Sequence, residues 1–204
     1  MDIALTIVAA YLLGAIPNAF LVARAFDGRD LRVEGSRNIG ARNAWEVTSN
    51  KGIGLAVLLL DMLKGALPVV ALVLLRRVDL IPYAAAATVF GHCYPIYLRF
   101  HGGRGLATAA AIGLCVSPVL VVAWLLFYVL GTFVRKNIHF QALLATFGIL
   151  VLELIFFEDG LTGAFSSVQF APSTLVLLHY ALLVMIGTIA SRHIQPVNEF
   201  LRSR

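Results

Sequence analysis

Residues 52–75 read GIGLAVLLLDMLKGALPVVALVLL and contain only two ionisable side chains, Asp61 and Lys64. An apolar run of this length suits a helix that crosses the hydrocarbon layer of a bilayer, which takes about 20 residues. The rest of the chain has the same character, because 60% of its 204 residues are hydrophobic and only 13% are charged. Soluble domains carry about 45–50% apolar and about 25% charged residues. The sequence therefore predicts an all-α integral membrane protein and excludes a soluble globular domain, a disordered tail and a nucleic-acid-binding module.

Further apolar blocks predict seven transmembrane helices in a single domain, residues 1–204. The stretch 106–134 would be about 43 Å long as one helix, too long for a hydrocarbon layer of about 30 Å. Ser117-Pro118 interrupts this stretch, so it forms either one kinked, tilted helix or two shorter helices. The expected seven helices span residues 3–23, 52–75, 80–98, 104–116, 118–134, 138–157 and 173–191, with a polar connector over 158–173.

The distribution of basic residues favours two shorter helices at this interruption. With seven helices and the N-terminus outside, every Lys and Arg except Lys64, Arg76 and Arg77 falls on the cytoplasmic side, together with the C-terminus. Six helices would instead put Arg135, Lys136 and the basic tail outside, against the positive-inside rule. The formal net charge of +5 is therefore explained by topology and by anionic ligands, without a nucleic-acid partner.

Few residues are suited to metal or thiol chemistry. Cys93 and Cys115 lie in apolar blocks and are expected as free thiols packed among helices. Asp61 and Glu153 are the only carboxylates well inside the expected helices, too few for a metal cluster. We therefore expect no metal site and no cofactor.

Two glycine-rich segments border the expected helices on the cytoplasmic side. Residues 35–43 read GSRNIGARN, in which glycine lets backbone amides turn toward a ligand while Ser, Asn and Arg donate to anionic oxygens. Residues 99–105 read RFHGGRG and precede a helix expected from Leu106, an arrangement suited to a phosphate at a helix N-terminus. The alternatives are a surface turn with helix-capping Asn and Ser for the first segment, and a basic turn against anionic lipid headgroups for the second.

Asp61, Lys64 and His92 are polar groups within apolar helices, where such groups are costly and are usually functional or mutually paired. Asp61 and Lys64 stand at i and i+3 on one helix face, so they can neutralise each other. His92 can donate to a phosphate or move a proton, or it can serve only as a polar group in helix packing. Pro95 is expected to bend the helix end and to direct His92 toward the cytoplasmic loops.

Together these motifs resemble the bacterial acyl-phosphate-dependent glycerol-3-phosphate acyltransferase family. The family pattern Gly-Ser-Gly-Asn-x-Gly-Ala-Thr-Asn is similar to residues 35–43, and Asp-x-x-Lys-Gly is found at 61–65. Gly-His-x-x-Pro is found at 91–95, and Phe-x-Gly-Gly-Lys-Gly-x-Ala-Thr is similar to residues 100–108. Any one of these motifs is weak, but three in the family's order and spacing over about residues 10–110 are specific.

The resemblance implies an enzyme that transfers a fatty acyl group from acyl phosphate to glycerol 3-phosphate, the first step of phospholipid synthesis. The product is lysophosphatidate, made at the inner face of the bacterial plasma membrane by a multi-pass protein that we expect to be a monomer in membrane lipid. The glycerol hydroxyl would attack directly and give its proton to substrate phosphate or to His92. The implied catalytic residues are His92, Ser36 and Arg104. The expected phosphate-binding residues are Ser36, Asn38, Gly40, Arg42, Asn43, Lys64, Gly102, Gly103, Arg104, Gly105, Arg192, His193 and Asn198.

The chain departs from the family pattern at several of these positions. Arg37 replaces the usual Gly, Arg42 replaces Thr, and Arg104 replaces Lys with a change of geometry. Glu46 stands where the family usually has Arg, and Arg42 can either pair with Glu46 at i+4 or take the place of the missing cation. Residues 137–141 read NIHFQ where serines are frequent.

The C-terminal tail matches its family pattern only in part. Arg192 and His193 agree with the pattern Arg-His-x-x-Asn-Ile, whereas Pro196 takes the Asn position unless Asn198 substitutes for it. These departures leave two alternatives open. One is a paralogue with another acyl donor or acceptor, and the other is a transporter or lipid-binding membrane protein without chemistry.

Overall fold

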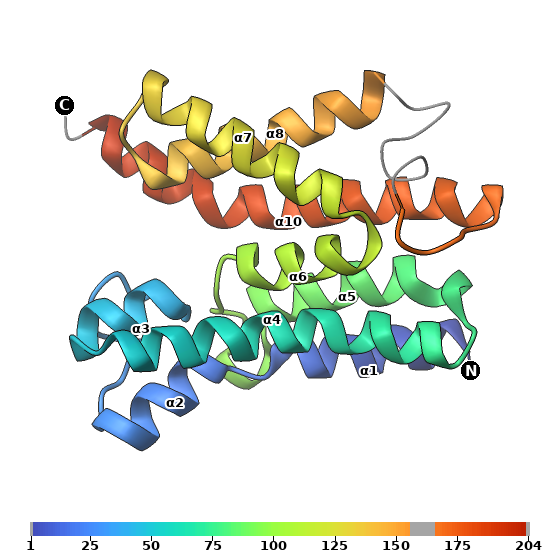
Figure 1. Cartoon of the computed structure of the whole chain (residues 1–204). Coiled ribbons are helices and arrows are strands. Elements are labelled where there is room, and N and C mark those ends of the chain that lie inside the picture. The colour runs from blue at the N-terminus through green and yellow to red at the C-terminus, as the bar shows by residue number, and fades with distance from the viewer. Residues whose placement is uncertain (1, 156–165, 203–204) are drawn as a thin grey trace.

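A computed structural model describes residues 2–155 and 166–202, and within these ranges the chain is helical with no strand (Figure 1). Two short 3-10 helices, η1 and η2, join longer α-helices. The elements are α1 (Ile3–Ala15), α2 (Asn18–Asp27), α3 (Ala41–Thr48), α4 (Lys51–Leu74), η1 (Val78–Leu80), α5 (Ile81–Cys93), η2 (Ile96–Leu98), α6 (Leu106–Val116), α7 (Pro118–Val134), α8 (Ile138–Ile155) and α10 (Pro172–Arg202).

Four segments of the described chain are long and apolar enough to cross a membrane. They are α1 together with α2, α4, α8 and α10, whereas α6 and α7 are shorter apolar helices. The break between α6 and α7 falls at Ser117, so the two-helix interpretation of this stretch is confirmed. These lengths are those of a multi-pass membrane protein.

Three helix boundaries differ from the expected ones by more than two residues, and two of these differences occur at prolines. The expected helix 3–23 is interrupted after Ala15, because Pro17 lacks an N–H and disfavours helical geometry at the residue before it. The expected helix 80–98 ends at Cys93, so Pro95 follows the helix end instead of bending it. The last helix runs to Arg202, well past the expected end at residue 191. Residues 156–165, which hold the first half of the expected connector, lie outside the described residues.

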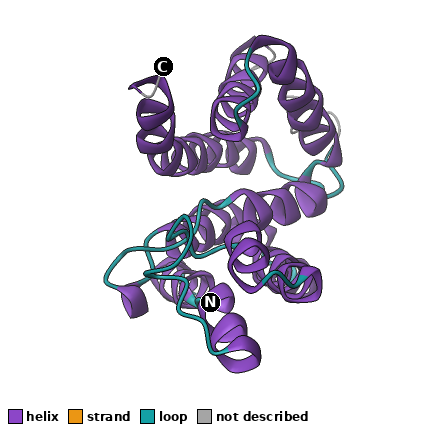
Figure 2. Cartoon of the chain, turned by 90° about the vertical axis from the view of Figure 1, so that its left-hand side faces the viewer, coloured by secondary structure: helices purple, strands orange, loops and turns teal. Residues whose placement is uncertain are grey.

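The helices form a bundle whose two ends differ. α1 packs on α5, α4 on α6 and α7 on α8, and α10 contacts both α5 and α8. In Figure 1 the N-terminus lies at the right-hand end, whereas α2, α3 and the C-terminus lie at the left-hand end. Figure 2 looks onto that left-hand end, where several connecting loops gather. We call it the loop end.

Glycines let several of these helices approach closely. A Cβ at Gly14 of α1 would collide with the carbonyl of Thr88 in α5, and a Cβ at Gly65 of α4 would collide with the carbonyl of Thr108 in α6. Membrane helices use small residues in this way, because van der Waals packing is a main source of their association. The α1–α5 and α4–α6 contacts hold the helices that carry the candidate site.

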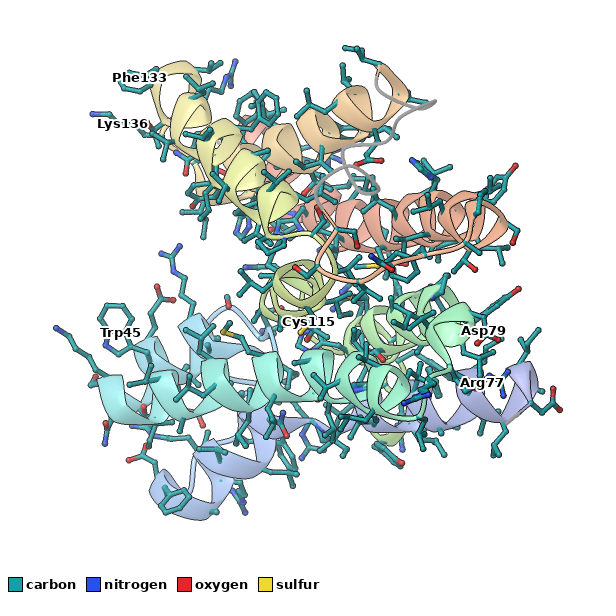
Figure 3. All side chains as sticks on the ribbon, turned by 45° about the vertical axis from the view of Figure 1, so that its right-hand side comes forward. Trp45, Arg77, Asp79, Cys115, Phe133 and Lys136 are labelled. Carbon is teal, nitrogen blue, oxygen red and sulfur yellow. The ribbon has the colours of Figure 1, made fainter. Side chains whose placement is uncertain are left out.

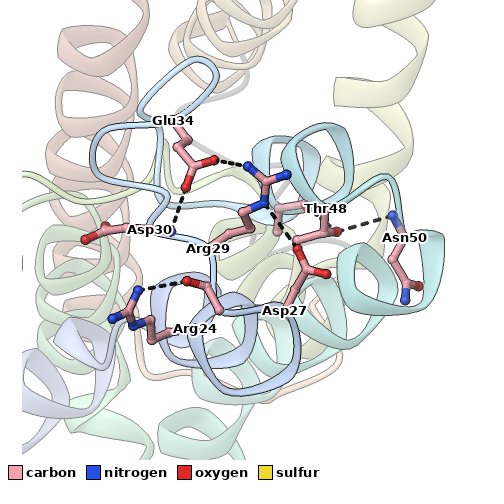
Figure 4. A network of polar contacts seen from close by, with 9 residues as sticks. Arg24, Asp27, Arg29, Asp30, Glu34, Thr48 and Asn50 are labelled. Atoms are coloured by element: carbon pink, nitrogen blue, oxygen red, sulfur yellow. Dashed lines mark hydrogen bonds and ion pairs between the residues drawn. The ribbon is translucent and has the colours of Figure 1, made fainter.

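At the loop end, the segment between α2 and α3 is held by local ion pairs (Figure 4). Arg29 pairs with Glu34 at 2.7 Å, and Arg32 pairs with Asp30 at 2.7 Å. The hydrogen bond from Arg32 is the main cause that lowers the pKa of Asp30 to about 2. Arg24 donates to the carbonyl of Gly28 at 2.8 Å. These bonds shape the loop and engage Arg24 of α2 and the first two arginines of the segment.

Charged and aromatic side chains mark both ends of the bundle (Figure 3). Trp45 and Lys136 lie at the loop end, and Arg77 and Asp79 lie at the opposite end, where they pair at 3.0 Å. Cys93 and Cys115 are free thiols, as expected, although only Cys93 is fully buried.

Candidate active site

The glycine-rich segment 99–105 folds back onto the end of α5. The amides of Gly102 and Gly103 donate to the carbonyls of Cys93 and His92, at 3.2 and 3.1 Å. A Cβ at Gly102 would collide with the His92 carbonyl, and a Cβ at Gly103 would collide with Nε2 of His92 and lie 2.7 Å from the carbonyl oxygen of Ile39. Only glycine fits between these groups. The segment therefore brings the end of α5 and the 35–43 loop together.

Arg104 follows these glycines and lies among other cations. Gly105 adopts the left-handed conformation with φ +82°, and α6 begins directly after it at Leu106. Burial is the main cause that lowers the pKa of Arg104 to about 10, and the charges of Arg192 and Arg42 lower it further. A guanidinium that is partly removed from water beside two other cations is well placed to hold an anion.

Arg192 of α10 clamps the glycine segment from the other side. Its Nη2 donates to the carbonyl of Gly102 at 2.9 Å, and its Nε donates to that of Gly103 at 3.3 Å. The guanidinium also lies 5.5 Å from the ring centroid of Tyr94. Arg192 is therefore at the site as expected, and two of its N–H groups support the loop.

A buried polar network lies beneath the glycine segment. Nζ of Lys64 is 3.0 Å from Oδ1 of Asp61, and both side chains are no more than 5% exposed, which confirms the predicted pair. Lys64 also donates to the carbonyl of Ile16 at 2.9 Å, and Asn18 donates to Oδ1 of Asp61 at 3.1 Å. Nδ1 of His92 lies 3.8 Å from the same oxygen. The network joins the α1–α2 break to α4 and α5, so Lys64 is held as an internal support.

The 35–43 loop is organised by Asn43, which is only 1% exposed. Its Oδ1 accepts from the amide of Ser36 at 2.9 Å, and its Nδ2 donates to the carbonyls of Glu34 and Leu31 at 3.3 and 3.5 Å. The side chain of Asn43 thus shapes the loop, while Ser36 is exposed. Oδ1 of Asn38 is buried without a hydrogen-bond partner among the described residues.

Two positions in this loop that depart from the family pattern, Arg37 and Arg42, can be related to the structure. Arg42 donates to Glu46 at 2.7 Å, which confirms the predicted i+4 pair. Arg37 has φ +56°, the left-handed region that favours glycine, at the position where the family usually has Gly. Gly40 has extended backbone and immediately precedes α3.

Two histidines from different helices meet near these arginines. The ring centroids of His139 in α8 and His193 in α10 are 5.6 Å apart. His193 is only 1% exposed, and its Nδ1 lies 2.9 Å from the carbonyl oxygen of Ile189. The charges of Arg104 and Arg42 act on His139. Sequence reasoning missed His139, whose only signal was a histidine at the start of an expected helix, just after a basic pair.

The structure does not bring Asn198 to this group. Asn198 is exposed and lines an open surface pocket together with Ser191 and Gln195, whereas His193 and Val197 on another face of α10 are buried. Residues five apart on a helix point in clearly different directions. The expected substitution of Asn198 for the family asparagine therefore has no support from its position.

An apolar cavity of about 180 Å³ extends from the site into the bundle, between α5, α6, α7, α8 and α10. Leu106, directly after Gly105, and Ile189, one turn before Arg192, are among its lining residues. Gly113, Trp124 and Thr146 line it farther along these helices. The glycine segment and the apolar cavity are therefore adjacent.

Comparisons with known proteins agree with this arrangement. The model of the family described as glycerol-3-phosphate acyltransferase matches residues 4–203. A glycerol-3-phosphate acyltransferase of Syntrophotalea carbinolica is 35% identical over 178 residues, which cover 85% of this chain and 88% of that protein. One of Macrococcus caseolyticus is 37% identical over 161 residues, covering 78% and 81%.

Solved structures show the same fold. The chain is similar to the crystal structure of PlsY (YgiH), an integral membrane glycerol 3-phosphate acyltransferase, in its glycerol 3-phosphate form, with a TM-score of 0.79 and 28% identity over 99% of this chain and 93% of that one. The lysophosphatidic acid form of PlsY gives a TM-score of 0.77 at 27% identity, with the same coverage.

The fold and the site thus define an integral membrane acyltransferase of phospholipid synthesis. Its glycine segment, partly buried arginines and apolar cavity suit a reaction between a phosphorylated alcohol and a lipid-like donor. The chain belongs to the glycerol-3-phosphate acyltransferase family.

Proposed function

We propose that this glycerol-3-phosphate acyltransferase uses acyl phosphate as its donor and works at the cytoplasmic face of a bacterial plasma membrane. We further propose seven crossings, with α5, α6 and α7 as the shorter ones, the N-terminus outside and the loop end in the cytoplasm. The PlsY structures in glycerol 3-phosphate and lysophosphatidic acid forms support the acceptor and the product. The basic residues at the loop end support the orientation, by the positive-inside rule.

One observation carries the proposal: the apolar cavity borders the glycine segment at Leu106 and Ile189. An acyl tail in this cavity would place its carbonyl carbon at the border and its phosphate beside Arg104. Fixed amides and guanidinium groups there would hold both phosphates and stabilise the tetrahedral oxyanion. Two anionic substrates would then meet beside an apolar cavity that excludes water from the tail.

The chemistry needs no covalent acyl-enzyme. The glycerol hydroxyl oxygen bonds to the carbonyl carbon, the bond from that carbon to the phosphate oxygen breaks, and inorganic phosphate leaves. The proton of the hydroxyl passes to the departing phosphate. The position of His92, 6% exposed with Nε2 against Gly103, favours phosphate over His92 as the acceptor. The buried Oδ1 of Asn38 can accept a hydrogen bond from a glycerol hydroxyl.

The test is acyl transfer to labelled glycerol 3-phosphate by the purified protein in lipid, with palmitoyl phosphate and palmitoyl-CoA compared as donors. We expect lysophosphatidate from palmitoyl phosphate only. Arg104→Ala should lower kcat/KM by about 10²–10³, the usual loss for a donor that stabilises an oxyanion. Lysophosphatidate from palmitoyl-CoA alone would show another donor, and full activity of Arg104→Ala would refute the site.

Acylation of Ser36 would also refute direct transfer. Mass spectrometry of the protein after a brief reaction with palmitoyl phosphate alone should find no palmitoyl group on Ser36. Uptake of glycerol 3-phosphate into sealed liposomes, in the absence of donor, is the matching test for the transporter alternative, and we expect none.

A further inference from the structure

His139 is held in a fixed position on the first turn of α8. Its amide and that of Phe140 each donate to Oδ1 of Asn137 at 3.0 Å, which caps the helix. Nε2 of Gln141 donates to the carbonyl of Arg135 at 3.0 Å. The backbone before and after His139 is therefore anchored, and its ring is presented to the site without depending on a mobile loop.

The charges near His139 favour the binding of an anion. Besides His193, the charges of Arg104 and Arg42 act on it, and the carboxylate that acts on Arg104 belongs to Glu46, which is already paired with Arg42. Arg104 and Arg42 thus contribute two positive charges, against the one carboxylate of Glu46. A bound phosphate would relieve their mutual repulsion.

His139 can donate a hydrogen bond to a phosphate, whereas neutral His193 cannot. Nδ1–H of His193 donates to the Ile189 carbonyl, so Nε2 of the neutral ring is an acceptor. The His139 ring makes no hydrogen bond within residues 2–155 and 166–202 and is only partly buried. Whichever of its nitrogens carries a proton can therefore donate to a phosphate oxygen.

Helix geometry places His139 on the donor side of the reaction. Thr146 of α8 lines the apolar cavity and lies seven residues after His139, close to two full turns on the same helix face. Ile149 continues this face along the cavity. A donor whose tail lies against Thr146 and Ile149 would therefore extend its phosphate toward His139.

We propose that His139 is a phosphate-binding residue for the acyl donor, an inference that rests on the proposed function. Its N–H would donate to a non-bridging oxygen of the donor phosphate.

The experiment measures KM for each substrate and kcat in His139→Ala, His139→Gln and wild type. Lost hydrogen bonds to charged groups predict a rise in donor KM of roughly 10-fold or more in His139→Ala, with the KM for glycerol 3-phosphate within about twofold. His139→Gln keeps an N–H donor and should recover most of the loss. Lys136→Ala, at an exposed cation three residues away, is the matched control and should behave as wild type.

Binding of inorganic phosphate to the purified protein, by calorimetry without any acyl donor, separates this inference from the proposed function. Weaker phosphate binding in His139→Ala supports the role of His139 even if wild type does not use palmitoyl phosphate. Unchanged phosphate binding and unchanged donor KM overturn it. So does an equal effect of Lys136→Ala, or a selective rise in the KM for glycerol 3-phosphate. If His139→Ala fails to fold, His139→Gln and His139→Asn are compared with wild type under the same criteria.

Discussion

Gly103 shows how one residue without a side chain determines the geometry of the site. It is packed against Nε2 of His92 and the carbonyl of Ile39, and Arg192 binds its own carbonyl. The segments that meet there are far apart in sequence. Space at Gly103 therefore limits how closely the glycine segment can approach both α5 and the first loop.

We predict that Gly103→Ala lowers acyl transfer about 10²-fold, because a displaced loop misplaces the reacting groups. The added Cβ cannot fit without a shift of His92 or of Ile39. Gly187→Ala is the matched control, since nothing lies within 4 Å of its Cβ. It should keep activity and gain about 1 kcal/mol of stability, because alanine favours a helix interior over glycine. Equal activity of the two variants would contradict the packing argument.

Arg37 is a second residue whose backbone matters more than its side chain. It is exposed with φ +56°, a conformation that costs a non-glycine residue about 1–2 kcal/mol. We predict that Arg37→Gly is at least as stable as wild type, because relief of this cost offsets the greater freedom of glycine in the unfolded chain. The measurement is the thermal unfolding midpoint in detergent, followed with a thiol-reactive dye at buried Cys93. Val33→Gly, where φ is not positive, is the control and should lower the midpoint. A midpoint for Arg37→Gly below that of wild type would contradict the prediction.

At the scale of elements, prolines occur both within helices and beside helix ends. Pro68 and Pro196 lie inside α4 and α10, whereas the chain leaves helical geometry next to Pro17 and Pro95. At the break before Pro17, the carbonyl of Leu13 accepts from the amide of Ile16 at 3.3 Å, and the carbonyl of Ile16 accepts from the amide of Asn18 at 3.0 Å and from Lys64 of α4 at 2.9 Å. A proline alone therefore does not locate a helix end, because two of these four prolines lie within continuous helices.

The Asp61–Lys64 pair predicts a large effect of a single change in α4. Lys64→Met should destabilise the protein by about 3–5 kcal/mol, because it leaves a buried carboxylate without its cation. The double variant Asp61→Asn with Lys64→Met removes both charges and should recover much of the loss in thermal unfolding. Arg32→Ala, which breaks an exposed pair with Asp30, should unfold close to wild type. A single Lys64→Met variant as stable as wild type would show that the pair has no structural role.

For the whole molecule, the two ends of the bundle should face different compartments. We predict that Asp2→Cys is labelled by a membrane-impermeant thiol reagent in intact cells, whereas Lys136→Cys is labelled only after permeabilisation. The background is Cys93→Ala with Cys115→Ala, checked for retained acyl transfer. Trp45→Cys, at the same end as Lys136, should follow it (Figure 3). Labelling of Asp2→Cys and Lys136→Cys from one side would overturn the proposed orientation.

The sequence by itself determined the membrane class, the family and the pairs Asp61–Lys64 and Arg42–Glu46. These depend on hydrophobic run length, on motif order, and on i+3 and i+4 spacing along one helix, all of which are local properties of the chain. Tertiary structure alone revealed the clamp made by Arg192 and the meeting of His139 with His193. Such contacts join residues from separate segments, so they depend on which helices pack together and on the rotation of each helix about its axis. Neither quantity is encoded in a spacing that can be read along a single chain.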